Sequence, residues 1–443
     1  MGEEMTTEDK AERKEWKGEK STKLMKCSQE ATIHQRDYIN DMRAKIKSGE
    51  QMIFGDGPRE LFYSMGLQFV PHVFYGSLMA AKQLYNHYKG TLEQQEYYSD
   101  GCSYCAQPFG YLLDDHPEIA PWGGLPKPLA IMAEGSYTCD TIMKIFELCA
   151  KALNVPYYPI SLAHRVNIPQ RWWEVQDGDA YMVDQWAKKY EGCAIFLETL
   201  TGRSYNPTKL REFLYRGDQS LEIYWKACDL ACSTVPAPIS VSDVFANVSA
   251  YNWHQASEWG LQHAKQFYSE VKERIENGET AVPDERVRLM WADTVPIWFS
   301  LGFYNHWEKS HGAVFIPRNY FDMAQRVIYY DRSDPLRVLA KRRNLKYTFP
   351  SPAATAEYLI YTAKRFKVDG VVAPLNYSCR KPHQAFAAEA LERAGIPTMK
   401  IVYDPFNADS WDDAKIKARV TEFIEKITPA AKKRIEMSSG GIR

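Results

Sequence analysis

The chain has 443 residues, enough for two or three domains with their own hydrophobic cores. Its formal net charge is −1, which gives no electrostatic reason to expect binding to nucleic acid or to an acidic membrane surface. The charged N-terminus lacks the apolar segment of a signal peptide, and the longest uncharged run, 61–81, holds too many Pro, Gly and polar residues for a membrane span. We therefore expect a cytoplasmic protein with no membrane segment, whose nine cysteines do not form a disulfide framework.

Hydrophobic periodicity predicts alternating helices and strands along the first half of the chain. The expected elements are a helix over 22–49, strands over 51–54 and 67–74, a helix over 76–97, a strand over 126–133, a helix over 141–153 and a strand over 155–161. Cys102 and Cys105 fall in a loop that follows the second of these helices.

The second half repeats the alternation after a largely helical stretch. We expect helices over 179–200, 207–216, 219–232 and 240–277, then strand 286–293, helix 306–312, strand 313–317, helix 353–366, strand 371–374, helix 383–395, strand 398–402 and helix 413–427. This order predicts an α/β protein with two Rossmann-like, doubly wound domains built on mainly parallel sheets. The expected boundaries are 1–49 for a mobile tail and N-terminal helix, 50–218 for the first α/β domain, 219–285 for a helical bridge, 286–430 for the second α/β domain and 431–443 for a tail.

Two cysteines occupy equivalent corners between a strand and the helix that follows it. Cys139 follows the strand 126–133, and Cys379 follows a strand that Pro374 is expected to end. In open α/β sheets ligands bind at this edge, and a thiolate there faces the N–H groups of a helix start. The pair indicates a site between two domains, although a loop cysteine can also be a packed residue without a function.

Cys102 and Cys105 are close enough in sequence to bind one metal ion or one iron–sulfur cluster, for which thiolates are preferred ligands. A single Cys-x-x-Cys pair is equally compatible with two buried thiols. The other cysteines lie in helical or polar surroundings and are expected to be structural: Cys27, Cys149, Cys193, Cys228 and Cys232.

The histidines show no zinc-binding spacing, and isolated histidines are more often hydrogen-bonded structural residues than ligands. His72, in an apolar run, and His383, shortly after the second corner, are the two candidates for proton transfer. Glu134, Ser136 and Asn376 either line a site at the corners or satisfy turns. Complete nucleotide-binding motifs are absent, so we expect neither ATP nor NAD to bind to this chain.

Four segments spread over about residues 50–425 share a pattern with a known family. They are PRELFYSMGLQFV at 58–70, GCSYCAQPFG at 101–110, PLAIMAEGSYTCDTIMKIFEL at 128–148, and VDGVVAPLNYSCRKPHQ at 368–384 with GIPTMKIVYDP after it. In these segments the chain resembles the 2-hydroxyacyl-CoA dehydratase and ATP-dependent benzoyl-CoA reductase family. The C-terminal segment is the most specific of the four.

The resemblance implies two Rossmann-like domains with helical additions and pairing with a homologous second catalytic subunit. It implies an iron–sulfur cluster near an acyl-CoA substrate, held by one cysteine from each matching segment: Cys102, Cys139 and Cys379. Electrons would come from a separate dimeric ATPase activator with its own cluster, supplied by ferredoxin, in agreement with the missing ATP motif. Cys105 departs from the three-cysteine pattern: it closes the open iron of a [4Fe-4S] cluster, helps to hold a double-cubane [8Fe-9S] cluster, or has no role.

Within this family we expect a large, cluster-bearing subunit of a benzoyl-CoA-type reductase of anaerobic aromatic degradation. The chain length, the insert IAPWGGLPKP and the many Trp and Tyr residues favour this function. Such an enzyme reduces an aromatic acyl-CoA ring to a cyclic diene by electron and proton transfers, with His72 or His383 as proton donor in a pocket that excludes water. The alternatives are a subunit of a radical 2-hydroxyacyl-CoA dehydratase, a double-cubane reductase of small molecules, and a cluster-free partner subunit that shapes the CoA pocket.

Overall fold

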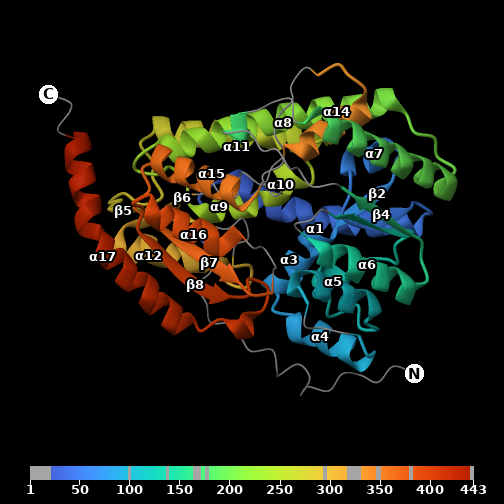
Figure 1. Ribbon diagram of the computed structural model, residues 1–443, viewed down its shortest axis with the longest axis horizontal. Helices are drawn as coiled ribbons and strands as arrows, with labels where there is room; N and C mark the ends of the chain where they lie inside the picture. The colour runs from blue at the N-terminus through green and yellow to red at the C-terminus, as the bar shows by residue number, and fades with distance from the viewer. Residues whose placement is uncertain are drawn as a thin grey trace.

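The structure, a computed structural model, describes residues 21–97, 101–135, 139–162, 171–174, 179–292, 297–316, 331–345, 351–378 and 383–439. Within these ranges the chain forms two four-stranded parallel sheets surrounded by helices, which confirms the predicted α/β class. The strands and helices of the first half lie to the right in Figure 1, and the second sheet, coloured from yellow-orange to red, lies to the left.

The first half of the chain contributes one sheet and the helices around it. Its strands are β1 (Met52–Gly55), β2 (Gln68–Pro71), β3 (Ala130–Gly135) and β4 (Tyr157–Ser161). Its helices are α1 (Lys26–Lys47), α2 (Arg59–Ser64), α3 (His72–Ala81), α4 (Tyr85–Gln94), α5 (Ser103–Leu113), α6 (Asp140–Leu153) and α7 (Ala180–Thr201), with 3-10 turns at Pro121–Gly123 and Trp172–Glu174.

A helical stretch then leads into the second half. Its helices are α8 (Pro207–Ser233), α9 (Val241–Ala246), α10 (Val248–Asn252) and α11 (Glu258–Glu276). The second sheet consists of β5 (Val287–Trp291), β6 (Ala313–Ile316), β7 (Gly370–Asn376) and β8 (Thr398–Tyr403). The helices of this half are α12 (Asn305–His311), α14 (Pro335–Asn344), α15 (Pro352–Arg365), α16 (His383–Arg393) and α17 (Asp413–Ser439), with 3-10 turns at Leu301–Tyr304 and Ala408–Ser410.

The two sheets have the same topology. Their strand orders are β2-β1-β3-β4 and β6-β5-β7-β8, and all neighbouring strands are parallel. In register, Ile53 of β1 pairs with Phe69 and Ala130, and Met290 of β5 pairs with Ile316 and Val371. Chain direction across the sheet therefore reverses between β1 and β3 and between β5 and β7, where ligands bind in open α/β sheets.

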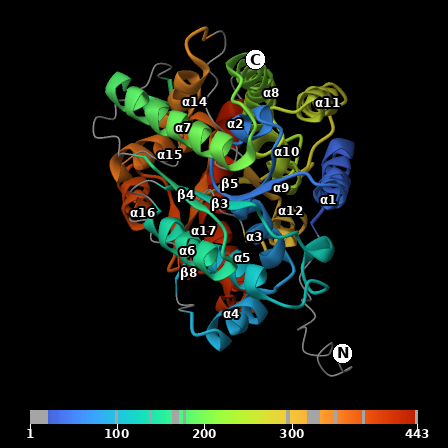
Figure 2. The ribbon, with the colours of Figure 1, turned by 90° about the vertical axis from the view of Figure 1, so that its right-hand side faces the viewer.

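Successive residues of the first sheet enter two separate cores. Ile53 and Met132 pack with residues of α7 and α8, whereas Phe54 and Ile131 pack with residues of α1 and α3 to α6. Figure 2 shows α7 and α6 on opposite sides of β3 and β4. A parallel sheet covered on both faces buries both sets of side chains, which explains why its strands read as continuous apolar runs.

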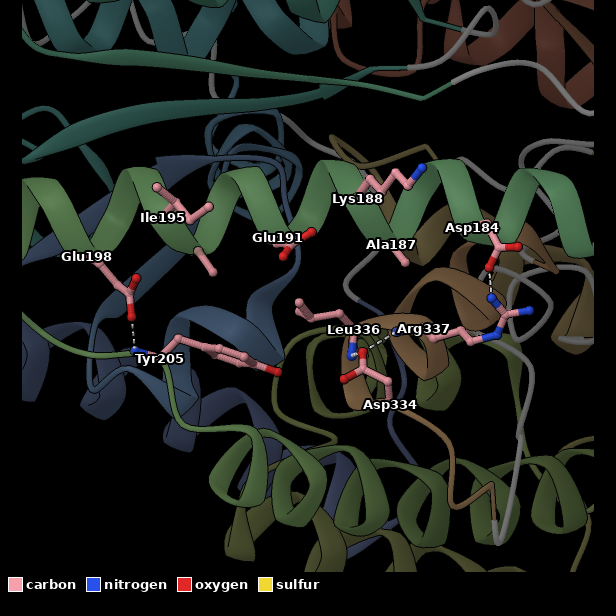
Figure 3. Close-up of a pocket in the computed structure, with 11 residues that line it drawn as sticks. Asp184, Ala187, Lys188, Glu191, Ile195, Glu198, Tyr205, Asp334, Leu336 and Arg337 are labelled. Atoms are coloured by element: carbon pink, nitrogen blue, oxygen red, sulfur yellow. Dashed lines mark hydrogen bonds and ion pairs between the residues drawn. The ribbon is translucent and has the colours of Figure 1, made fainter.

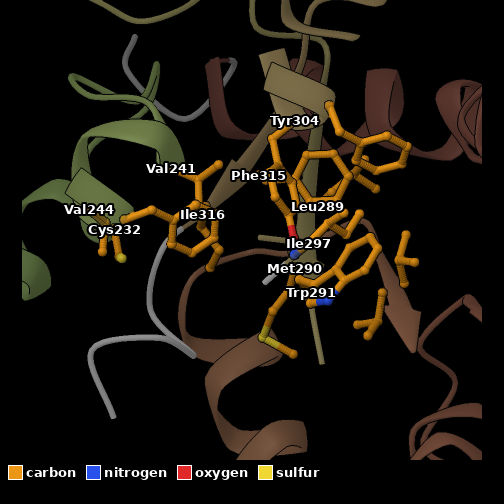
Figure 4. Close-up of a cluster of buried hydrophobic side chains, with 14 of the residues drawn as sticks. Cys232, Val241, Val244, Leu289, Met290, Trp291, Ile297, Tyr304, Phe315 and Ile316 are labelled. Carbon is orange, nitrogen blue, oxygen red and sulfur yellow. Dashed lines mark hydrogen bonds between the residues drawn. The ribbon is translucent and has the colours of Figure 1, made fainter. Parts of the chain in front are cut away.

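Aromatic side chains fill the core beside β5. Trp291 and Tyr304 meet edge to face with ring centroids 5.3 Å apart, and Tyr304 meets Phe315 in the same way at 5.3 Å. Figure 4 shows these rings with Leu289 and Ile297. Edge-to-face pairs stabilise a core beyond the area they bury, so part of the high aromatic content is used in packing.

The two halves are joined by helices that pack across them. α8 and α11 lie side by side along the top of Figure 1. α14 comes between β6 and β7 in the chain, yet it packs against α7 and α8, and its Leu336 and Leu339 enter the core of the first sheet. A segment of the second half of the sequence thus completes the first core, while the domain boundaries given above stay a prediction.

Several predicted elements differ from the observed ones. The helix expected over 76–97 is two helices, α3 and α4, because the chain turns at Gln83, where φ is +57°. The loop expected at Cys102 and Cys105 is the start of α5, and the helices expected over 207–216 and 219–232 are one helix, α8. The stretch 240–277 divides into α9, α10 and α11, and α17 continues past 427 to Ser439.

Strand β7 continues past Pro374, where we expected it to end. It pairs with β5 only as far as Val372, whereas its pairing with β8 runs on to Asn376. Among the described residues, the strand beyond Val372 therefore pairs on the β8 side alone, and a residue without an N–H is tolerated there. No helix in the described part of the chain combines the length and the apolar composition that a membrane span requires.

Candidate functional site

The segments that lead from β3 to Cys139 and from β7 toward Cys379 leave the carboxyl edges of the two sheets, next to the positions where chain direction reverses. Cys139 comes four residues after the end of β3, and Tyr377 and Ser378 continue from the end of β7 toward Cys379. Residues 136–138 and Cys379 itself are outside the described residues. The topology thus places Cys139, and Ser378 at the end of the described residues before Cys379, at the edge where α/β sheets bind ligands.

Cys102 and Cys105 lie together at the start of α5. Cys102 occupies the N-cap position, and the N–H groups of Cys105 and Ala106 donate to its carbonyl oxygen at 3.0 and 2.9 Å. A hydrogen bond from the Cys105 side chain and bonds from the N–H groups of Cys105 and Tyr104 hold the pKa of the buried Cys102 thiol below its ordinary value, against the opposing effects of burial and of the Asp404 charge. The start of α5 therefore favours the thiolate, which is the form that binds metal.

Cys139 lies at the start of the neighbouring helix. It is the N-cap residue of α6 and is partly exposed. α5 packs against α6, and a Cβ on Gly101 would lie 3.7 Å from Ile145 and 4.0 Å from Thr141. The starts of these two helices therefore lie close together, and both present N–H groups that favour negative charge.

The corner of the second half reaches the same place through Ser378. The hydroxyl oxygens of Ser378 and Ser103 are 3.2 Å apart, and the N–H of Ser378 donates to Asn376 Oδ1 at 3.0 Å. Ser378 precedes Cys379, and Ser103 follows Cys102. Asn376 thus shapes the turn, which is one of the two roles considered for it. Among the described residues, no three or more His, Cys, Asp or Glu side chains are arranged to hold a metal ion.

The two predicted histidines are placed differently. His72 begins α3, is buried, and has Nδ1 3.1 Å from the carbonyl oxygen of Gly55 at the end of β1. Because a carbonyl oxygen only accepts, Nδ1 carries the proton in this bond. The ring also meets Phe146 edge to face at 4.8 Å. His383 begins α16, and its side chain is outside the described part of the chain.

A buried ionic network lies beneath this edge of the first sheet, and sequence reasoning missed most of it. Arg343 of α14 donates to Glu134 Oε2 at 2.7 Å and to the carbonyl oxygen of Gly57 at 3.0 Å. Tyr190 donates to the other oxygen of Glu134 at 3.2 Å. Glu134 therefore has a structural role at the end of β3. No local sequence pattern signals Arg343, because its partner Glu134 is 209 residues away in the chain.

Asp404 is a second residue that sequence reasoning missed. It directly follows β8, is almost completely buried, and accepts the hydroxyl of Ser103 at 2.7 Å. Burial raises its pKa, and hydrogen bonds from Ser103, Phe406 and Ser378 oppose that effect. The signal was available, because an acidic residue directly after a strand lies at the ligand-binding edge of a parallel sheet.

An open groove of about 680 Å³ lies elsewhere, between α7 and α14 (Figure 3). Several of its charged side chains have partners: Asp184 pairs with Arg337, and Glu198 accepts the N–H of Tyr205 at 2.7 Å. Asp334 accepts the N–H groups of Leu336 and Arg337 at the start of α14. Among the described residues that line this groove there is neither a cysteine nor a histidine.

Comparison with known proteins assigns a family to this arrangement. Residues 56–427 match the family of the 2-hydroxyglutaryl-CoA dehydratase D-component. The chain belongs to this dehydratase family. The chain is also similar to the (R)-2-hydroxyisocaproyl-CoA dehydratase alpha subunit of Clostridioides difficile. The two sequences are 18% identical over 346 residues, which cover 76% of this chain and 81% of the relative.

The match to the dehydratase family confirms the resemblance seen in the sequence. All four candidate cysteines and both candidate histidines lie inside the matched residues 56–427. The names of the family and of the relative are those of dehydratases, which are lyases, so the expected benzoyl-CoA reductase finds no support in them. The chain is accordingly a component of a dehydratase-family enzyme.

Proposed function

We propose that the chain is the cluster-bearing subunit of a radical 2-hydroxyacyl-CoA dehydratase, which converts a 2-hydroxyacyl-CoA into an enoyl-CoA and water. The observation that carries the proposal is the contact between Ser103 and Ser378, because it brings the start of α5, which carries Cys102, to the segment that precedes Cys379 in a chain of the dehydratase family. The dehydratase, which the sequence offered as an alternative to a benzoyl-CoA-type reductase, is thus the main proposal.

The cysteines are suited to an iron–sulfur cluster. Cys102, Cys139 and Cys379 would hold a [4Fe-4S] cluster, and Cys105, whose side chain bonds to that of Cys102, is placed to be a fourth ligand. Soft thiolates are the ligands these clusters use, and the start of α5 favours the thiolate of Cys102. When bound, the cluster supplies one-electron chemistry next to the thioester.

The surrounding residues would keep water away and handle protons. Tyr104 stacks on Phe406 with ring centroids 3.7 Å apart, and Phe146 covers one side of His72, so the buried side of the site is apolar. Dehydration removes a hydroxyl and a proton from neighbouring carbons. Because Nδ1 of His72 donates to Gly55, its Nε2 is the atom that would accept a proton. We retain His383 as a second proton-transfer candidate.

The proposal includes partners and a setting. The matched relative is named an alpha subunit and the matched family a D-component, which supports a homologous second subunit in the same enzyme. An electron would reach the cluster from a dimeric ATPase activator with its own cluster, reduced by ferredoxin, in the cytoplasm of an anaerobe. This chain would contribute no ATP site of its own.

The features that favoured an aromatic substrate have structural uses. Trp186, Trp253 and Trp307 are almost completely buried in the cores. Tyr75 donates to the carbonyl oxygen of Pro121 at 3.0 Å, which attaches the insert before β3 to α3. Abundant aromatic residues and this insert are therefore explained by packing, and they carry no argument for reduction of an aromatic ring.

Activity and ATP use test the proposal together. The chain, purified anaerobically with its partner subunit and activator, is assayed with (R)-2-hydroxyisocaproyl-CoA and with benzoyl-CoA. We expect enoyl-CoA formation with much less ATP hydrolysed than product formed, because the electron is recycled. Ring reduction of benzoyl-CoA with stoichiometric ATP use would overturn the proposal in favour of a reductase.

Iron analysis tests the cluster separately. We expect about four irons and matching acid-labile sulfide per chain, with an EPR signal after reduction. About eight irons would replace the proposal by a double-cubane reductase. A folded chain without iron that still assembles with its partner would be a structural subunit.

A further inference from the structure

Asp404 connects the start of α5, which carries Cys102, with the segment that precedes Cys379 through a short network of hydrogen bonds. Its carboxylate accepts the hydroxyl of Ser103 at 2.7 Å. The hydroxyl oxygen of Ser378 lies 3.2 Å from that of Ser103, and its own proton has an acceptor in Asn376 Oδ1 at 3.1 Å. Ser378 also bonds to Asp404 itself, which lowers the pKa of that carboxyl. One carboxylate therefore lies within two hydrogen bonds of the residues next to Cys102 and Cys379.

The segment after β8 holds this carboxylate in place. The N–H of Phe406 donates to Asp404 Oδ1 at 2.9 Å, and the Ser410 hydroxyl bonds to the backbone of Asp404 at 2.9 and 3.1 Å. Phe406 in turn stacks on Tyr104 of α5, with 16° between the ring planes. The second half of the chain thus presents Asp404 to the first half on an ordered segment.

Burial makes these hydrogen bonds important. Asp404 is 1% exposed and Ser103 is fully buried. A buried carboxylate that loses a hydrogen-bond donor is left poorly solvated. The bonds among Asp404, Ser103 and Ser378 therefore strongly favour the arrangement in which all three side chains are in contact. Hydrogen bonds to a charged acceptor are also stronger than those between neutral groups.

We propose that Asp404 is a positioning residue that fixes the spacing between the Cys102 and Cys379 segments through Ser103 and Ser378. We call these three residues the Asp404 clasp. The cysteines come from different halves of the chain, so without the clasp their segments would have to be ordered when the cluster binds. Ordering ligands in advance reduces that cost. The purpose assigned to the clasp rests on the proposed function, whereas the clasp itself is a property of the polypeptide.

The test compares Asp404→Ala, Asp404→Asn and Ser103→Ala with the wild-type chain by hydrogen–deuterium exchange and by iron content. Asp404→Asn keeps an acceptor oxygen, and Ser103→Ala removes one buried hydroxyl with little change in volume. Asp369→Asn is the matched control: this carboxylate accepts the N–H of Arg288 at 2.9 Å, at the opposite end of β7.

In Ser103→Ala and Asp404→Ala we expect exchange in peptides around 101–107 and 372–378 to become about tenfold faster, the effect of losing one hydrogen bond to a charged acceptor. Iron per chain should fall in both variants and recover largely in Asp404→Asn. The control should match the wild type. Ser103→Ala carries the test if Asp404→Ala does not fold.

Unchanged exchange in both Ser103→Ala and Asp404→Ala would overturn the clasp, and so would equal loosening in Asp369→Asn. The outcomes also separate the clasp from the proposed function. A wild-type chain without iron whose variants still exchange faster would sink the cluster and leave the clasp standing. A wild-type chain with its full iron content, whose variants exchange no faster than it does, would overturn the clasp and leave the cluster standing.

Discussion

Arg343 and Glu134 are 209 residues apart in the chain and form an ion pair of 2.7 Å in which both side chains are almost completely buried. Arg343 comes from α14 in the second half of the sequence, and Glu134 ends β3 of the first sheet. The pair fixes α14 over the carboxyl edge of that sheet. Its energetic importance follows from burial, because either charge would be costly to leave alone there.

We predict that Arg343→Met destabilises the protein by about 3–5 kcal/mol, since it leaves the carboxylate of Glu134 buried without its cation. Urea denaturation of the wild type and the variant measures the loss in the free energy of unfolding. Adding Glu134→Gln to Arg343→Met should restore much of the loss. A single variant as stable as the wild type would show that the pair contributes little.

Iron binding should depend on the cysteines of the corners and not on cysteines in general. Cys102→Ser and Cys139→Ser are expected to lose most of the bound iron, because each removes a thiolate ligand. Cys193 in α7 is the matched control, because burial raises the pKa of its thiol well above the ordinary value. Iron and sulfide analysis of anaerobically purified variants decides this, and iron loss in Cys193→Ser would argue against the assigned ligands.

His72→Asn tests proton transfer with little change to the fold. The asparagine amide can still donate to the carbonyl oxygen of Gly55, but Nε2 of the ring is removed. We expect kcat to fall by about 10²-fold or more, which is typical for loss of a general acid or base. His87→Asn, on the partly exposed histidine that pairs with Asp114 at 3.0 Å, should keep full activity. Full turnover in His72→Asn would exclude His72 from proton transfer.

Two glycines in neighbouring helices should respond to alanine with opposite signs. A Cβ on Gly110 of α5 would lie 2.3 Å from the carbonyl oxygen of Tyr88, so Gly110→Ala should cost about 1–3 kcal/mol through overpacking. A Cβ on Gly90 of α4 meets nothing within 4 Å, so Gly90→Ala should stabilise by about 0.5–1 kcal/mol through helix propensity. Chemical denaturation measures both, and equal signs would contradict the packing described for α4 and α5.

Acid should destabilise the protein partly through His34. Its ring stacks on Trp259 at 3.6 Å, and burial together with the charge of His263 lowers its pKa from 6.5 to about 4. Between these values the unfolded chain binds a proton that the folded chain does not, so stability is full above pH 6.5 and falls as the pH drops toward 4.

The variant His34→Phe keeps the stacked ring and removes this titration. We expect its melting temperature to fall less than that of the wild type between pH 7.5 and pH 5, as measured by thermal denaturation. Asp243 and Glu308 have raised pKa values and titrate with the opposite sign, but they are present in both proteins and cancel in the difference. An equal fall in both proteins would contradict the shift at His34.

The sequence by itself determined the alternating order of strands and helices and the corner at Cys139, whereas the corner at Cys379 stays a prediction. Strands such as β1 and β3 are runs of apolar residues whose burial on both faces leaves little freedom in their assignment. The position of a residue just after such a strand then places it at the ligand-binding edge, which located Cys139 directly. The family also followed from these local segments, although the choice between its members did not.

Only the tertiary structure decided which distant residues meet at that edge. α14 has little apolar character of its own, and Arg343 becomes meaningful only when the helix crosses to the first sheet and meets Glu134. Ser103 and Asp404 are 301 residues apart, and neither has a local pattern that predicts their hydrogen bond. Hydrophobic periodicity shows which face of a helix or strand is buried, but not which distant element packs against that face. The contacts of Arg343 and Asp404 depend on how the helices bring the two sheets together.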